Sequence, residues 1–360
     1  MTNTSIAGDG TPGREREVGS EEGVVEPVEL DDVSPIRRLQ HLLHSHPSTI
    51  PALVLALSVL TFGMLVGARF FQPFNLSLIL QQVTVIGCVG VAQTLVVLTA
   101  GIDLSVGAIM VLCSVVMGKL AVLAGVPAPL AVCAGLATGA AAGFVNGFLV
   151  SAVRLPPFIV TLGTWNIFFA LNLWYSHSET IRSQDIETSA PLLQFFGWAV
   201  DIGGARFTNG SIFMILLFAL FWYVLNWTAW GRRVHAVGDD VESARLAGIP
   251  TGRMLITVYV TGGVICAMAG WVLIGRIGSV SPQSGQTANL DSITAVVIGG
   301  TSLFGGRGSI IGTLLGALIV GVFRNGLALS GVDVLWQDFA VGLLSIAAVA
   351  IDQSLRRLSM

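Results

Sequence analysis

The sequence predicts an all-α integral membrane protein with about ten transmembrane helices. Of its 360 residues, 53% are hydrophobic and only 11% are charged, and the mean hydropathy is +0.80. A soluble domain of this length would not show that balance. The hydrophobic residues gather in runs of roughly 17–25 residues, the length that a helix needs to cross a bilayer. Apolar and polar residues do not alternate within the runs, which argues against a transmembrane barrel.

Ten apolar runs follow one another along the chain, and each predicts one membrane helix. The eighth run is short, and the second could be interrupted near Gly101. Residues 174–210 form the longest connection on one face. The runs cover residues 50–68, 78–100, 104–125, 128–151, 157–173, 211–228, 254–276, 291–304, 309–329 and 334–352.

The N-terminal segment before the first run differs from the rest of the chain. Residues 1–34 contain nine acidic residues, only two arginines and no apolar periodicity. Such a composition is typical of disorder, so we expect residues 1–46 to form a disordered, acidic tail and residues 47–360 to form the membrane domain.

The basic residues predict the orientation of the chain. With ten spans, twelve of the 18 Lys and Arg residues fall on the side of the N-terminus and six on the opposite side. Because cytoplasmic loops carry an excess of Lys and Arg, we expect both termini in the cytoplasm.

The two halves of the chain show a weak internal similarity. GFVNGFLV at 143–150 is similar to VFRNGLAL at 322–329, which matches Asn146 with Asn325. Asp103 and Asp291 each open an apolar helix in the corresponding part of its half. The paired helices would run in opposite directions, so the pattern indicates an inverted five-plus-five repeat. Chance similarity between low-complexity helices is the alternative.

Small and charged residues add two expectations about packing. Gly135, Gly139 and Gly143 are spaced by four, as are residues 308, 312 and 316, which favours close helix contacts. Arg324 and Asp338 fall near the same face and are expected to form an ion pair.

A charged island at residues 227–254 separates two apolar runs. Asp239 and Asp240 offer an N-cap for a short helix over 241–247, Gly248 suits its C-terminal cap, and Pro250 prevents its continuation. A helix of about two turns is not stable alone in water, so we expect another protein to hold it. An ordinary solvated loop is the alternative. The candidate contact residues are Asp239, Asp240, Val241, Glu242, Ala244, Arg245, Leu246, Ala247 and Gly248.

No pattern in the chain indicates an enzyme. The four cysteines lie singly in apolar runs, and there is no catalytic triad, metal-binding spacing or paired cysteine motif. The glycine cluster at 305–308 lacks the Lys-Ser/Thr of a phosphate-binding loop and is expected to be a tight turn. We therefore expect no catalytic residues, cofactor, metal ion or nucleic acid, and a lipid bilayer as the surrounding partner.

Four long motifs carry a family resemblance: GIDLSVGAI (101–109), LPPFIVTLGTW (155–165), the stretch from AWGRR to ARLAGI (229–249) and AVVIGGTSLFGGRGSIIGTLLGALIVG (295–321). They resemble the permeases of bacterial ABC importers for monosaccharides, the ribose, xylose and galactose group. The resemblance runs from about residue 50 to residue 355. Three further stretches, 175–186, 192–197 and 270–282, resemble the fructose import permeases of this group in particular.

The resemblance implies a sugar importer of the bacterial inner membrane. Two permease copies would sit on two cytoplasmic ATP-binding subunits and receive fructose, or else ribose or mannose, from a periplasmic sugar-binding protein. Residues 229–253 would be the loop that couples the permease to the ATPase. A secondary carrier or facilitator without an ATPase partner is the alternative from another class.

An uncharged sugar would need a path with sparse amide and hydroxyl groups and aromatic walls. Six residues fit that description, and hydrogen bonds between packed helices are the competing explanation for them. These path candidates are Asn146, Thr161, Thr164, Trp165, Asn166 and Asn325.

Overall fold

The computed structural model describes residues 48–285 and 287–358, so the predicted acidic tail lies outside the described residues. The helices in chain order are α2 (Thr49–Val66), η1 (Gly67–Arg69), α3 (Pro73–Leu98), α4 (Val106–Gly118), η2 (Lys119–Leu123), α5 (Ala128–Ser151), α6 (Pro157–Ser176), α7 (Ser183–Ser189), η3 (Pro191–Gly197), α8 (Asn209–Trp227), α9 (Ala229–Asp239), α10 (Val241–Leu246), α11 (Thr251–Ile277), α12 (Ala288–Ile298), α13 (Ile310–Leu329) and α14 (Val334–Leu358). Strands β1 (Ala199–Ile202) and β2 (Ala205–Thr208) lie between η3 and α8.

The membrane helices agree with the ten predicted runs. Within the described part of the chain, eight helices are long and apolar enough to cross a bilayer. Two shorter apolar helices, Ala288–Ile298 and Val334–Ala347, correspond to the eighth and tenth runs. Helix α3 ends at Leu98, so the predicted interruption near Gly101 is the connection to α4.

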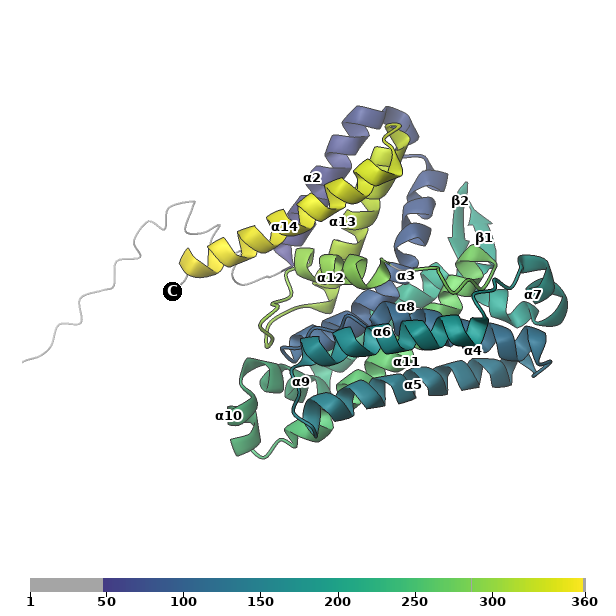
Figure 1. Ribbon diagram of the computed structural model, residues 1–360. Helices are drawn as coiled ribbons and strands as arrows, with labels where there is room; N and C mark the ends of the chain where they lie inside the picture. The colour runs from purple at the N-terminus through teal and green to yellow at the C-terminus, as the bar shows by residue number, and fades with distance from the viewer. Residues whose placement is uncertain (1–47, 286, 359–360) are drawn as a thin grey trace, which may run out of the picture. The chain divides into compact units, whose positions relative to one another are not determined.

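Helices α3 and α11 lie side by side at the centre of the helical bundle. Helix α11 also packs on α4 and α5, and α3 packs on α8, α12 and α13. Figure 1 shows α4, α5 and α6 running alongside one another. The core between these helices is built from small and branched side chains such as Val89, Ala92, Cys266 and Val272, which are all fully or almost fully buried.

Glycines allow the closest helix crossings, as their spacing predicts. A Cβ on Gly139 of α5 would overlap the carbonyl group of Gly263 on α11. A Cβ on Gly312 of α13 would likewise overlap the carbonyl group of Gly299, which follows α12. Only glycine lets the backbones approach this far, so dispersion contacts between backbones replace side-chain packing at these crossings.

The connection after α6 is more structured than the sequence predicts. It contains α7, η3 and an antiparallel hairpin in which Ile202 pairs with Ala205. Gly203 and Gly204 both have positive φ, the conformation that a two-residue hairpin turn requires. The hairpin and an isolated antiparallel bridge between Ile181 and Val280 are the departures from the all-α prediction in the described residues. The Gly-Gly pair between two β-prone segments is the signal for the hairpin.

The helices of the two halves can be placed in the same order, and the inverted repeat itself stays a prediction. In the first half α2, α3, α4, α5 and α6 follow one another, and in the second half α8, α11, α12, α13 and α14 take the same places. Each half has a long second helix, an irregular connection and then an acidic residue near the start of the third helix. The acidic residue is Asp103 before α4 and Asp291 in the first turn of α12.

Candidate coupling segment and membrane path

The charged island folds into two short helices rather than one. Helix α9 begins at Thr228, whose hydroxyl oxygen accepts a hydrogen bond from the Gly231 amide at 3.2 Å. Helix α10 follows after a single residue, Asp240. The sequence predicts α10 but not α9, because α9 depends on contacts with distant parts of the chain.

Helix α10 has the caps that the sequence predicts. The Asp240 side chain accepts a hydrogen bond from the Ser243 amide at 2.7 Å, while Asp239 is the last residue of α9. That hydrogen bond lowers the pKa of the Asp240 carboxyl, so the cap is charged at neutral pH. Gly248 ends the helix with a φ of 81°.

The two sides of α10 differ in exposure. Ala244 is only 4% exposed and packs within the chain, whereas Leu246 is 80% exposed. Glu242 and Arg245 form an exposed ion pair at 2.6 Å. Helix α10 therefore has one side that packs within the chain and one side that is exposed.

Helix α9 is fixed to the membrane helices by three contacts. The Trp230 indole donates to the Thr257 hydroxyl of α11 at 3.1 Å, and the His235 ring lies 3.1 Å from the Gly306 carbonyl oxygen. Gly238 packs directly on the carbonyl of Leu98, at the end of α3. The Gly306 amide donates to that same carbonyl at 3.0 Å. The Gly305 amide donates to the Ser302 carbonyl at 3.1 Å, and Gly305 and Gly306 have positive φ, so the chain turns tightly here as predicted.

The connection from α3 to α4, residues 99–105, is irregular and is held by side chains from four other helices. Thr161 of α6 donates to the Ile102 carbonyl at 2.9 Å, and Asn146 of α5 donates to the Ser105 hydroxyl at 2.8 Å. Asn289 of α12 donates to the Leu104 carbonyl at 3.3 Å. The Tyr259 hydroxyl of α11 lies against Gly101. This connection therefore joins α4, α5, α6, α11 and α12, and its start at Leu98 is the contact point of α9.

Four of the six path candidates are buried, and three of them bridge separate parts of the chain. Asn146 and Thr161 hold the 99–105 connection. Asn325 donates to the side-chain oxygen of Asn75 at 2.9 Å and so joins α13 to α3. Thr164 is also buried, on the same helix as Thr161. The remaining two differ: Asn166 is exposed and bonds to the Leu162 carbonyl of its own helix, and Trp165 is half-buried.

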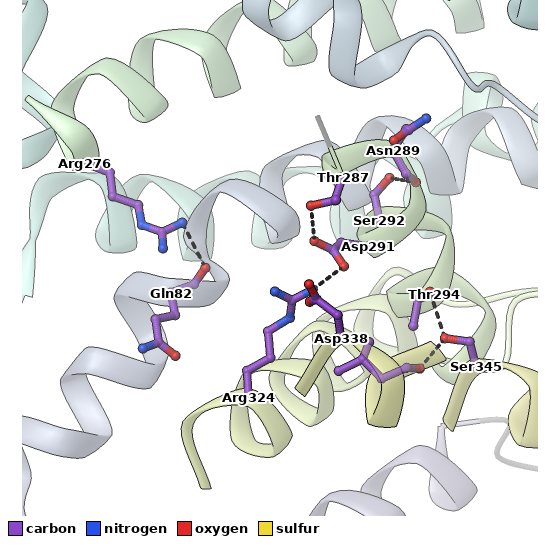
Figure 2. Close-up of polar contacts among 11 residues, drawn as sticks. Gln82, Arg276, Thr287, Asn289, Asp291, Ser292, Thr294, Arg324, Asp338 and Ser345 are labelled. Carbon is purple, nitrogen blue, oxygen red and sulfur yellow. Dashed lines mark hydrogen bonds and ion pairs between the residues drawn. The ribbon is translucent and has the colours of Figure 1, made fainter. Parts of the chain in front are cut away.

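An ion cluster joins three helices at the opposite end of the bundle from α10. The Arg324 guanidinium of α13 lies 2.8 Å from Asp291 of α12 and 3.2 Å from Asp338 of α14. The predicted pair of Arg324 and Asp338 is thus confirmed, and Asp291 is a second partner that the sequence did not predict. Figure 2 shows Arg276 of α11 on the other side of this cluster, where it donates to the Gln82 carbonyl at 3.3 Å.

Comparison with known proteins identifies the type of chain that carries these features. The profile of a family described as the branched-chain amino acid transport system permease component matches residues 75–349. The chain belongs to this permease family. It is therefore a multi-pass membrane component of a transport system and not an enzyme, as the sequence predicts.

Individual relatives cover almost the whole chain. The fructose import permease protein of Rhizobium meliloti is 60% identical over 328 residues, which is 91% of both chains. The ribose import permease protein of Bacillus subtilis is 37% identical over 303 residues, 84% of this chain and 92% of the relative. The D-allose transport system permease protein of Escherichia coli is 36% identical over 301 residues, 83% of this chain and 90% of the relative. No solved structure matches the chain.

Proposed function

We propose that the permease is the membrane-spanning subunit of an ATP-driven importer for a monosaccharide, and that its substrate is fructose. The single observation that supports this most strongly is the 60% identity to a fructose import permease over 91% of both chains. The relatives at 36–37% identity are named for ribose and allose, which supports the sugar class more broadly.

An amino acid substrate, which the description of the family suggests, is less well supported. A zwitterionic amino acid would need fixed charges of both signs along its path. The exposed polar candidate on a membrane helix, Asn166, carries no charge. Amides and aromatic rings suit the hydroxyl groups and apolar faces of a sugar.

The proposal includes three kinds of protein partner. A cytoplasmic ATP-binding subunit would contact α10 through its exposed side, a second copy of the permease would complete the path, and a periplasmic binding protein would deliver the sugar. The ATP-binding subunit is needed because the chain contains no phosphate-binding loop of its own. In this arrangement the protein lies in the bacterial inner membrane with both termini and α10 on the cytoplasmic side.

The contacts around α9 suggest how a conformational change driven by ATP hydrolysis is passed to the membrane helices. Movement of the ATP-binding subunits would shift α10 and, through α9, the backbone of Leu98 and Gly306. The 99–105 connection begins at this point and holds α4, α5, α6, α11 and α12 together. A shift there would reorient several helices at once, which is what alternating access requires.

Uptake experiments test the proposed substrate. A strain that lacks its own sugar importers would express the permease with its ATP-binding subunit and binding protein and receive labelled fructose, ribose, mannose, allose or leucine. We expect the fastest uptake for fructose at limiting concentration. Leucine uptake above that of every sugar would contradict the proposal.

A further inference from the structure

Asp103 is a buried carboxylate without a basic partner in the described residues. It is 4% exposed, and the ion pairs found in residues 48–285 and 287–358 involve other acids. The Ser105 amide and hydroxyl donate to its Oδ1 atom at 2.7 and 2.6 Å, and the Val106 amide also faces it. These bonds cap α4, but they come from neutral groups and leave the negative charge uncompensated.

The second half of the chain shows how such a charge is compensated. Asp291, in the first turn of the third helix of its half, is paired with Arg324. The match of Asn146 with Asn325 places Val145 where the second half has Arg324. Val145 is exposed and apolar, so the first half offers Asp103 no guanidinium group.

Three buried oxygen atoms beside the 101–105 segment have no hydrogen-bond partner among the described residues. They are Asn146 Oδ1, Asn289 Oδ1 and the Tyr259 hydroxyl. The amide nitrogens of the two asparagines bond to Ser105 and to the Leu104 carbonyl, which fixes both side chains next to the 101–105 segment. The Tyr259 hydroxyl lies 3.1 Å from the place that a Cβ on Gly101 would take. Unpartnered oxygens at buried positions are rare, and a bound water molecule or ion is a common explanation for them.

The chemistry of this cluster fits a small ion of single positive charge. It combines one carboxylate with neutral amide and hydroxyl oxygens, which are ligands for hard cations. No group of three or more His, Cys, Asp or Glu that could hold a metal ion occurs in the described residues, so a transition metal is not favoured. The carbonyl end of α3, with its partial negative charge, lies at the same connection, an arrangement that suits sodium in discontinuous membrane helices.

We propose that Asp103, together with Asn146, Tyr259 and Asn289, binds an alkali-metal cation, sodium or potassium. The cation takes the place that Arg324 occupies beside Asp291 in the second half. It neutralises Asp103 and ties α5, α11 and α12 to the 99–105 connection. The proposal does not rest on the identity of the transported sugar.

Equilibrium binding of radioactive cations tests the site directly. The purified complex of permease and ATP-binding subunit, in detergent with choline chloride as the only other salt, would be titrated with ²²Na⁺ and with ⁸⁶Rb⁺ as a potassium analogue. We expect saturable binding of about one ion per permease copy, competed by unlabelled sodium or potassium. Asp103→Asn should abolish it, whereas Asp201→Asn, an exposed acid on β1, should leave it unchanged.

A second variant covers the case in which Asp103→Asn does not fold. Tyr259→Phe removes one hydroxyl and keeps the packing of the ring, and it should raise the dissociation constant by about tenfold. Absence of saturable binding of both ions to the natural protein would overturn the proposal. Unchanged binding in Asp103→Asn would overturn it as well. Because no sugar or transport is involved, either result would leave the proposed import function standing.

Discussion

Gly238 of α9 lies against the carbonyl group of Leu98 at the end of α3, with no side chain between the two backbones. A Cβ at position 238 would overlap the Leu98 oxygen and lie 2.7 Å from the Gly306 nitrogen. Helix α9, the end of α3 and the 305–308 turn therefore meet backbone to backbone. A displacement of α9 is passed on directly through such a contact, because no side chain lies between the backbones that could absorb it by changing its rotamer.

Adding a methyl group at this contact should uncouple ATP hydrolysis from transport. Gly238→Ala forces α9 away from Leu98, and overpacking of this kind costs about 1–3 kcal/mol. We expect the ATP-binding subunit to remain bound through α10. Fructose uptake should fall, and so should the stimulation of ATP hydrolysis by fructose. Gly252→Ala in α11 is the control, because its nearest neighbour is Ser151 Cβ at 3.9 Å. Equal uptake by both variants would show that the close contact at Gly238 is not required.

Leu246 should be necessary for binding of the ATP-binding subunit. Leu246→Asp places a charge on the exposed side of α10, and burying it without a partner in a protein contact costs several kcal/mol in order of magnitude. Co-purification of the ATP-binding subunit should be lost at normal membrane levels of the permease. Ile202→Asp, which changes another exposed apolar side chain, on β1, should retain it.

Ala244 and Leu246 are equivalent candidates in the sequence, but the structure separates them. Because Ala244 is buried within the chain, Ala244→Asp would disturb the packing of α10 itself, and a loss of coupling would have two explanations. Normal co-purification and uptake by Leu246→Asp would therefore be the clearer contradiction of the proposed contact.

The membrane helices and α10 could be predicted because their signals are local. Apolar runs determine where the membrane helices lie. Asp240 and Gly248 mark the two ends of α10 through hydrogen bonds to residues at most a few positions away. Helix α9 could not be predicted, since its packing partners Leu98 and Gly306 are distant in sequence. The same holds for Tyr259 and Asn289, which lie in apolar helices and gain their positions beside the 101–105 segment only when the chain folds.

The ion cluster at the opposite end from α10 should contribute to stability. In Arg324→Met, Asp291 stays 11% exposed but loses its counter-charge. Removing one member of a buried pair costs about 3–5 kcal/mol, and we expect the lower part of that range because the Arg324 side chain is 29% exposed. The melting temperature of the purified permease should fall clearly.

Two further variants separate charge from packing in this cluster. Arg324→Met combined with Asp291→Asn should recover most of the loss, because no buried charge is left unpaired. Asp338→Asn should have a smaller effect, since Asp338 is half exposed. If the single variant Arg324→Met had the same melting temperature as the natural protein, the stabilising role of the ion cluster would be refuted.

Asn166 and Trp165 remain the proposed lining of the sugar path. An exposed amide on a membrane helix is costly against lipid, so a polar path or a second permease copy is the better environment. Asn166→Leu should lower fructose uptake and leave assembly with the ATP-binding subunit unchanged. Asn226→Leu on α8 is a matched control, because Asn226 is also exposed and also bonds to a carbonyl of its own helix. Equal uptake by the two variants would remove Asn166 from the path.

Trp165→Ala tests the aromatic wall separately. The half-buried ring packs at the edge of the core, so its removal should reduce uptake more than it reduces the melting temperature. A variant that loses assembly altogether would instead assign Trp165 a packing role.

The most direct test of the account is whether transport depends on ATP hydrolysis by the partner. Proteoliposomes would contain the permease with either the natural ATP-binding subunit or a variant of that subunit that binds ATP without hydrolysing it. Labelled fructose and the binding protein would be placed on one side of the membrane and ATP on the other, and uptake of the fructose would be measured. We predict uptake against a gradient with the natural subunit and none with the variant. Equal uptake in both, or uptake by the permease alone, would contradict it and identify the chain as a facilitator or secondary carrier.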